Sequence, residues 1–164
     1  MAIFFENPSR EFHLRELSRL LKFSMPTIIS VTNILSREKL IIKVKEKVLT
    51  KAMAMANREN IDFTRHKRLY NLERIYASGI VDFLSNAYNH PKNIILFGSF
   101  SRGEDTENSD VDIALATHKK MDLDFAKCEK ILGRKVSIHE IDLDKINDEF
   151  KANLANGMVL EGSW

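Results

Sequence analysis

Two acidic residues, Asp110 and Asp112, stand in an otherwise apolar run of this 164-residue chain. The run from Val111 to Leu115 has the composition of a buried strand, and side chains two apart in a strand point to the same face. Two neighbouring carboxylates repel each other unless a cation lies between them. Because Mg²⁺ takes oxygen ligands, the spacing predicts a divalent cation site, for Mg²⁺ or Mn²⁺, at these two acids.

A glycine-serine pair precedes the two acids and predicts a second part of the same site. Gly98 and Ser99 follow a strand-like run, residues 93–97, and lead into a helix expected near Ser101. Glycine lets a backbone approach closely, and the amides of a helix start and the serine hydroxyl favour phosphate oxygens. Arg102 is placed to hold a phosphate as well. A Gly-Ser pair alone is usually a surface turn, but followed by Asp-x-Asp it indicates a phosphate site.

The segment GSFSRGEDTENSDVDIAL, taken whole, resembles the signature of the minimal nucleotidyltransferases of the DNA polymerase beta superfamily. The resemblance covers about residues 93–155. It implies that Gly98 and Ser99 hold the triphosphate of ATP or another NTP, and that Asp110 and Asp112 bind the metals. The implied reaction transfers a nucleoside monophosphate, AMP in the case of ATP, to an acceptor hydroxyl with release of pyrophosphate.

The next strand-like run, LGRKVSIHEIDL, departs from that family pattern. The family usually carries a third carboxylate here, and the alignment places Ser137 at its position. If Val136 and Ile138 face the core, Ser137 and His139 share the open face and Glu140 lies on the core side. Glu140 is a candidate third acid only if the strand ends or bulges before it. A role for His139 as a base is a weaker alternative to an ordinary structural histidine.

The first part of the chain has the order of a winged helix-turn-helix: helix 12–21, a short turn, helix 25–37 and a basic hairpin in LIIKVKEKVLTKAMAM. A third helix is expected over 63–77, with Leu69, Leu72 and Tyr76 among its apolar residues. The side chains expected to contact DNA are small polar groups of the second helix and lysines of the hairpin: Thr27, Ser30, Thr32, Asn33, Lys43, Lys45 and Lys47. The same elements also occur in modules that dock proteins or dimerise, so that alternative stays open.

Charge is unevenly distributed along the chain. Residues 8–51 carry ten Lys or Arg against four Asp or Glu, whereas residues 93–164 carry nine against fourteen. A basic half suits a polyanion such as duplex DNA, and an acidic half suits metal ions or solubility. The asymmetry favours two domains with different partners.

The predicted fold class is α+β, in three parts. Residues 1–56 form the winged helix-turn-helix, 57–90 a helical linker, and 91–164 a mixed-sheet nucleotidyltransferase domain with flanking helices. The single cysteine, Cys128, cannot form an internal disulfide, so we expect a core residue and a cytoplasmic protein. No apolar run approaches the ~20 residues of a membrane-spanning helix, and the start MAIFFENPSREF lacks a signal-peptide pattern.

Two hypotheses for the whole protein remain. The first is an NTP-dependent transferase; similar minimal domains act as antitoxins that adenylylate a toxin, often a HEPN-domain ribonuclease encoded beside them, and a winged helix would add operator binding as a homodimer. The second is a DNA-binding regulator whose degenerate nucleotidyltransferase domain senses nucleotide or docks a partner. Ser137 favours the second hypothesis, and the intact Gly-Ser pair and Asp pair oppose it.

Overall fold

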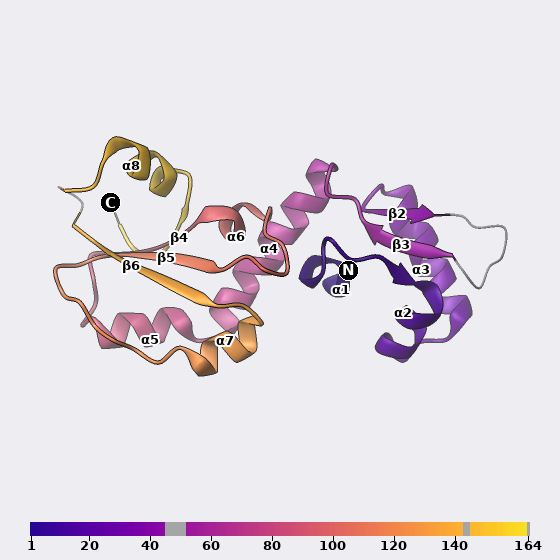
Figure 1. The fold of residues 1–164 in the computed structure, drawn as a ribbon, viewed down its shortest axis with the longest axis horizontal. Helices are drawn as coiled ribbons and strands as arrows, with labels where there is room; N and C mark the ends of the chain where they lie inside the picture. The colour runs from indigo at the N-terminus through magenta and orange to yellow at the C-terminus, as the bar shows by residue number, and fades with distance from the viewer. Residues whose placement is uncertain (45–51, 143–144, 164) are drawn as a thin grey trace. The chain divides into compact units, whose positions relative to one another are not determined.

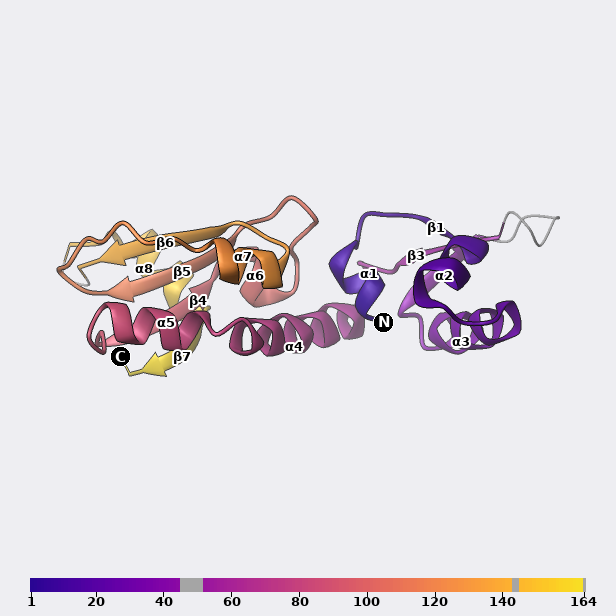
Figure 2. The ribbon, with the colours of Figure 1, turned by 90° about the horizontal axis from the view of Figure 1, so that it is seen from below.

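A computed structural model describes residues 1–44, 52–142 and 145–163 of the chain. The chain divides into two compact units, residues 1–66 and 67–164, and the division falls inside helix α4 (Ile61–Ala77). Figures 1 and 2 show the elements of each unit. Among the described residues, no helix is both long enough and apolar enough to cross a membrane.

The N-terminal unit combines helices with a small antiparallel sheet in the order β1-β3-β2. Its elements before α4 are α1 (Ala2–Glu6), β1 (Phe12–His13), α2 (Leu14–Leu21), α3 (Met25–Arg37), β2 (Ile41–Val44) and β3 (Met53–Ala56). Helix α3 has the predicted bounds because Ser24 caps it, accepting from the Thr27 amide at 3.4 Å, and Pro26 fits its first turn. The expected start of the preceding helix was wrong: Phe12 and His13 pair with β3, and α2 begins only at Leu14.

The C-terminal unit is a four-stranded mixed sheet covered by helices, in the strand order β6-β5-β4-β7. Its elements after α4 are α5 (Ile80–Ala87), β4 (Asn93–Phe97), α6 (Gly98–Arg102), β5 (Val111–Ala116), α7 (Ala126–Leu132), β6 (Val136–Ile141), α8 (Asp148–Ala155) and β7 (Met158–Gly162). Strand β4 is antiparallel to both β5 and β7, whereas β5 and β6 are parallel. The mixed α+β character expected from the sequence is confirmed.

Both faces of this sheet are packed, so all five residues of β4 are buried. Ile94, Leu96 and Ile113 lie in the larger cluster, with side chains of α5 and α7, and Cys128 belongs to it as expected. Ile95 and Ala114 face the other way, into a smaller cluster with Leu154 of α8 and its neighbour Phe150. Figure 1 shows α8 on one side of the sheet and α5 and α7 on the other. The alternation along β4 and β5 therefore decides which side chains share a face with α8.

Candidate active site

One edge of the C-terminal sheet gathers several of the residues singled out in the sequence. Because β4 runs antiparallel to β5 and β5 runs parallel to β6, β4 ends at the edge where β5 and β6 begin. The register pairs Phe97 with Asp112, and Asp112 with Ser137. Gly98 follows β4 directly, so the Gly-Ser pair, Asp112 and the position of the missing acid lie side by side.

Gly98 touches Asp112, and the contact requires glycine. Its φ is +72°, in the left-handed region that side chains disfavour. A β-carbon at Gly98 would stand 2.6 Å from Oδ2 of Asp112, well inside van der Waals contact. The glycine therefore lets the backbone that leads into α6 lie directly against the carboxylate.

The next residues form the short helix α6 and hold its turn closed. The Ser101 hydroxyl donates to the Gly98 carbonyl at 2.8 Å, and Ser99 is half-buried. Arg102 is partly exposed, and its Nε donates to Oε2 of Glu104 at 2.8 Å. Ser99 is thus next to the contact between Gly98 and Asp112, while the Arg102 guanidinium is held by an acidic neighbour at the other end of α6.

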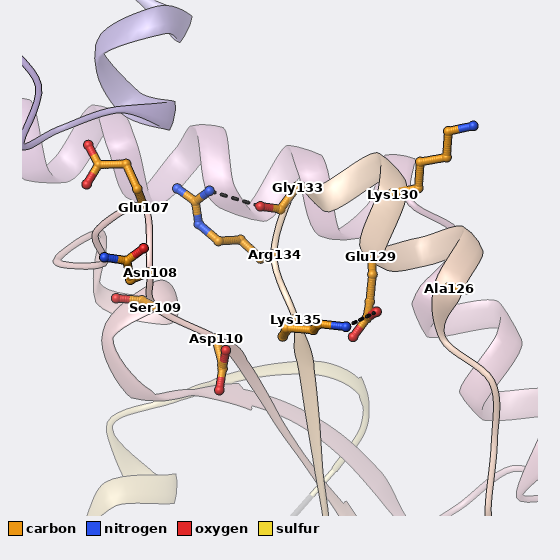
Figure 3. Close-up of a pocket in the computed structure, with 10 residues that line it drawn as sticks. All are labelled: Glu107, Asn108, Ser109, Asp110, Ala126, Glu129, Lys130, Gly133, Arg134 and Lys135. Atoms are coloured by element: carbon orange, nitrogen blue, oxygen red, sulfur yellow. Dashed lines mark hydrogen bonds and ion pairs between the residues drawn. The ribbon is translucent and has the colours of Figure 1, made fainter.

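The two acids differ in their surroundings. Asp112 is half-buried within β5, whereas Asp110 is exposed and lies just before the strand. Asp110 lines a pocket of about 550 Å³, together with its neighbours 107–109, residues 133–135, and Ala126, Glu129 and Lys130 of α7 (Figure 3). Both acidic and basic side chains line this space, so a polar ligand fits it better than an apolar one.

Glu129 stays charged on the wall of that pocket. The Val136 amide donates to its carboxylate at 3.0 Å, and Lys135 pairs with it at 3.3 Å. The amide hydrogen bond, with a smaller contribution from Lys135, lowers the pKa of Glu129. The start of β6 is thereby tied to α7, and this connection fixes where Ser137 enters the site.

Strand β6 presents Ser137 and His139 on the face of Asp112. Nε2 of His139 lies 3.4 Å from Oδ1 of Asp112 and 3.4 Å from the Ser137 hydroxyl. The imidazole also packs against Phe97 and Phe150, with ring centroids 5.1 Å and 6.1 Å away. A histidine thus stands beside Asp112, next to the serine at the position expected for the third acid.

Glu140 lies on the opposite face of β6 and is not brought to the site. Its Oε1 accepts hydrogen bonds from the Tyr88 hydroxyl at 2.6 Å and the Met121 amide at 2.7 Å. Burial and this hydrogen bond raise the pKa of Tyr88, so the phenol remains a donor. The strand continues without a break to Ile141. The condition under which Glu140 would be the third acid is therefore not met.

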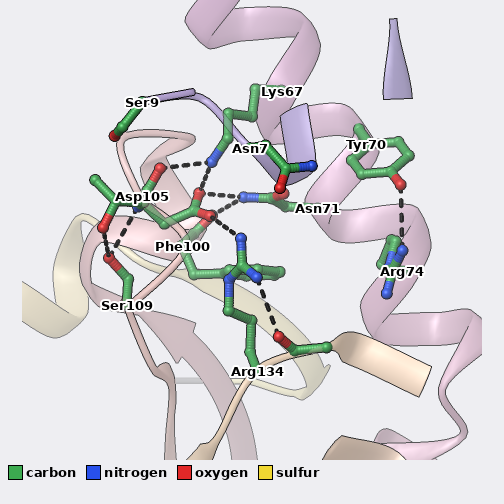
Figure 4. A network of polar contacts seen from close by, with 12 residues as sticks. Asn7, Ser9, Lys67, Tyr70, Asn71, Arg74, Phe100, Asp105, Ser109 and Arg134 are labelled. Carbon is green, nitrogen blue, oxygen red and sulfur yellow. Dashed lines mark hydrogen bonds and ion pairs between the residues drawn. The ribbon is translucent and has the colours of Figure 1, made fainter. Parts of the chain in front are cut away.

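A buried polar network supports the loop between Gly98 and Asp110 (Figure 4). Lys67 and Asp105 form an ion pair with both side chains 1% exposed, and Lys67 Nζ also donates to the Asp105 carbonyl at 2.8 Å. Asn71 donates to Oδ1 of Asp105 at 2.7 Å and to the Phe100 carbonyl at 2.9 Å. Arg134 approaches Oδ2 of Asp105 at 4.0 Å. The network joins α4 and α6 to the loop that contains Asp105 and to Arg134, two residues before β6.

The comparison with known families accounts for this arrangement. Residues 79–163 match the family described as polymerase beta, nucleotidyltransferase. The chain belongs to this nucleotidyltransferase family. A protein of Methanocaldococcus jannaschii named "Putative protein adenylyltransferase" is 39% identical over 77 residues, which cover 42% of this chain and 77% of that relative. The protein is thus a nucleotidyltransferase, and the family match lies in its C-terminal unit.

The nucleotidyltransferase has a donor set that fits a divalent cation in part. The Asp112 carboxylate lies against Gly98, which has no side chain to displace it, and its oxygens can bind a cation. Asp110 has a second carboxylate, on the wall of the pocket. No three His, Cys, Asp or Glu side chains within the described ranges come together as a metal cluster. Water and substrate oxygens would complete the coordination, as is usual for Mg²⁺ bound with phosphates.

In the N-terminal unit, three of the residues expected to contact DNA are exposed on α3 and one is buried. Thr27, Ser30 and Asn33 are exposed along α3, and Asn33 accepts from Lys43 Nζ at 2.7 Å. Thr32 is 3% exposed, and its hydroxyl donates to the Ile28 carbonyl at 2.7 Å, so it is not a surface contact. Lys45 and Lys47 lie outside the described residues.

Proposed function

We propose that the protein transfers AMP from ATP, or NMP from another NTP, to an acceptor hydroxyl, with Mg²⁺ or Mn²⁺ as cofactor. The observation that carries this proposal is the contact of Gly98 with Asp112, which joins the phosphate half of the motif to its metal half. Pyrophosphate release from each of the four NTPs, measured with Mg²⁺ and with Mn²⁺, tests the proposal. With an extract of the cells present to supply the acceptor, release from none of them above that of the extract alone would overturn it.

Each residue of the site has a proposed task in this reaction. Asp110 and Asp112 hold the cation, which when bound neutralises the charge of the phosphates. Ser99 donates to a phosphate oxygen, and Arg102 turns from Glu104 toward the phosphates. Gly98 keeps the backbone close enough for these contacts. The pocket beside Asp110 has room for part of the substrate, and its charged walls suit a polar one.

A protein hydroxyl is the proposed acceptor. The support is the name of the archaeal relative, which describes a protein adenylyltransferase. A toxin encoded beside the protein, such as a HEPN-domain ribonuclease, is the proposed partner, and its modification would silence it. We place this activity in the cytoplasm, where ATP and such a partner meet.

Ser137→Asp should raise the transfer rate, on the order of tenfold or more if a lost base limits the reaction. Serine is a weak metal ligand and a poor base near neutral pH, and Ser137 lies directly across from Asp112. Nucleotide affinity should change much less. Single-turnover transfer and calorimetric ATP binding separate the two effects.

Glu140→Gln is the matched control for that change, because Glu140 lies on the other face of the same strand. It should leave transfer nearly unchanged. A variant that folds normally yet loses transfer would show that Glu140, not the position of Ser137, supplies the third acid.

The N-terminal unit is proposed to be a winged helix-turn-helix that binds duplex DNA and regulates its own operon. Three exposed polar side chains, Thr27, Ser30 and Asn33, recur along α3 at helical spacing and suit base edges and phosphates. Lys43 stands beside Asn33 and adds positive charge. Binding to a palindromic operator would require a homodimer.

Replacing Lys43, Lys45 and Lys47 together with alanine should weaken DNA binding and flatten its dependence on salt. For each lysine that binds a phosphate, its removal should lower the slope of log affinity against log salt by roughly one. Asn33→Ala should instead change the preferred sequence. Fluorescence anisotropy with duplexes over a range of salt measures both effects. Full-length protein that ignores duplex DNA at low salt would favour a protein-docking role.

A further inference from the structure

The position where the family usually has its third carboxylate is filled by a different set of donor atoms. Ser137 brings a hydroxyl, and His139, two residues later on the same face, brings Nε2. Nε2 of His139 lies 3.4 Å from the Ser137 hydroxyl and 3.4 Å from Oδ1 of Asp112. A nitrogen donor thus shares the space around Asp112 with two oxygens.

The separation between His139 and Asp112 fits a shared cation better than a direct hydrogen bond. An N–H···O bond usually spans about 2.9 Å, and 3.4 Å is long for one. Two atoms bound at about 2.1 Å to one cation lie roughly 3.0–3.4 Å apart in octahedral or tetrahedral geometry. The two side chains are therefore already spaced as neighbouring ligands would be.

The surroundings hold the imidazole in this orientation and leave it reachable. Phe97 meets the ring nearly edge-on, at an interplanar angle of 72°, and Phe150 of α8 packs beside it. The side chains of His139 and Asp112 are 37% and 31% exposed. An ion can therefore reach Nε2 and Oδ1 without opening the core, while the aromatic contacts limit the rotation of the ring.

We propose that His139 is a ligand of the cation held by Asp112, and that this nitrogen donor shifts the site from Mg²⁺ toward first-row transition ions such as Mn²⁺. The inference rests on the proposed function, in which Asp112 binds the metal. Mg²⁺ strongly prefers oxygen ligands, whereas imidazole suits transition ions. Replacing the carboxylate with these donors would then change which metal the site prefers, and would not simply remove a ligand.

The test uses the full-length chain with Mn²⁺ alone, without nucleotide. Bound Mn²⁺ should show the ¹⁴N coupling of a histidine ligand in pulsed electron paramagnetic resonance, and His139→Ala or His139→Asn should remove it. Both variants should weaken Mn²⁺ binding on the order of tenfold and change Mg²⁺ binding, measured by competition, much less. His118→Ala, which removes an exposed histidine of the same unit, should change nothing.

Asp112→Asn separates the failure of this inference from the failure of the proposed function. If Asp112→Asn loses Mn²⁺ while wild-type Mn²⁺ shows no ¹⁴N coupling and His139→Ala keeps its affinity, His139 is not a ligand and the metal role of Asp112 stands. If Asp112→Asn binds Mn²⁺ as tightly as the wild type, the metal assignment itself is overturned, and the inference with it.

Discussion

Asp112→Asn should abolish metal-dependent nucleotide binding while the protein stays folded. The amide keeps the size of the side chain and its contact with Gly98, but it removes the charge that a divalent cation requires. Loss of a metal ligand should lower the affinity for ATP on the order of 100-fold or more when the cation is present. Asp110→Asn should have a similar effect through the second carboxylate.

Calorimetric titration of ATP with Mg²⁺ and with Mn²⁺ measures this loss, and circular dichroism verifies the fold. Asp122→Asn is the matched control, because Asp122 is an exposed acid of the same unit outside the site. Removing one of two repelling carboxylates should leave the metal-free protein as stable as before, or slightly more so. Unchanged ATP affinity in both site variants would refute the metal-site assignment.

Lys67→Met should destabilise the C-terminal unit by up to about 3–5 kcal/mol, since it removes the nearer cation of the buried Asp105 carboxylate and leaves the Arg134 guanidinium at 4.0 Å. Asp105 belongs to the loop that leads to Asp110, so cation binding should weaken as well. Hydrogen exchange measured by mass spectrometry on peptides from β4 and β5 reports this unit separately from the other. Lys127→Met, an exposed change in the same unit, should have little effect.

A double variant tests whether the unpaired charge is the cause. Adding Asp105→Asn to Lys67→Met removes the buried carboxylate charge as well, while Asn71 can still donate to the new side chain. Part of the lost stability should return, because a neutral amide costs less to bury than a carboxylate that has lost its nearer cation. If the double variant is less stable than Lys67→Met, packing around Lys67 and not its charge explains the loss.

Much of the sheet around the site could be predicted because successive side chains of a strand point to opposite faces of the sheet. The assignment of Val136 and Ile138 to the core side placed Ser137 and His139 on the open face. The register of β5 with β6 then pairs Ser137 with Asp112. Strand β4 also has the predicted bounds, since a fully apolar run between turn residues has few other solutions. The geometry between Gly98 and Asp112 needed the structure, since contact across strands depends on register.

Other parts could not be derived from apolar periodicity. The buried face of α4 contains Phe63, Lys67, Asn71 and Ile75, so two of its four residues are polar. Leu69 and Tyr76, expected on the apolar face, are 67% and 51% exposed. The i, i+4 spacing of the buried set was present in the sequence, but only the partner Asp105 explains why Lys67 belongs to it.

Two further differences arise from pairing and local hydrogen bonds. Strand β7 was not expected, because a five-residue segment near the end of the chain becomes a strand only by pairing with β4. Thr32 was expected at the surface, yet its hydroxyl returns to the helix carbonyls of Ile28 and Ile29 and the side chain is buried. Neither outcome can be decided from residue type alone.

The most direct test of the central claim compares two labelled forms of ATP. The full-length protein is incubated with an extract of the cells that make it, with Mg²⁺ or Mn²⁺, and with ATP labelled at either the α- or the γ-phosphate. Nucleotidyl transfer predicts a labelled acceptor protein with the α-label only, an equal amount of pyrophosphate, and no labelling by Asp112→Asn. Labelling from the γ-phosphate that requires the added protein, or α-labelling by Asp112→Asn that exceeds the labelling of the extract alone as much as that by the wild type does, would contradict the account.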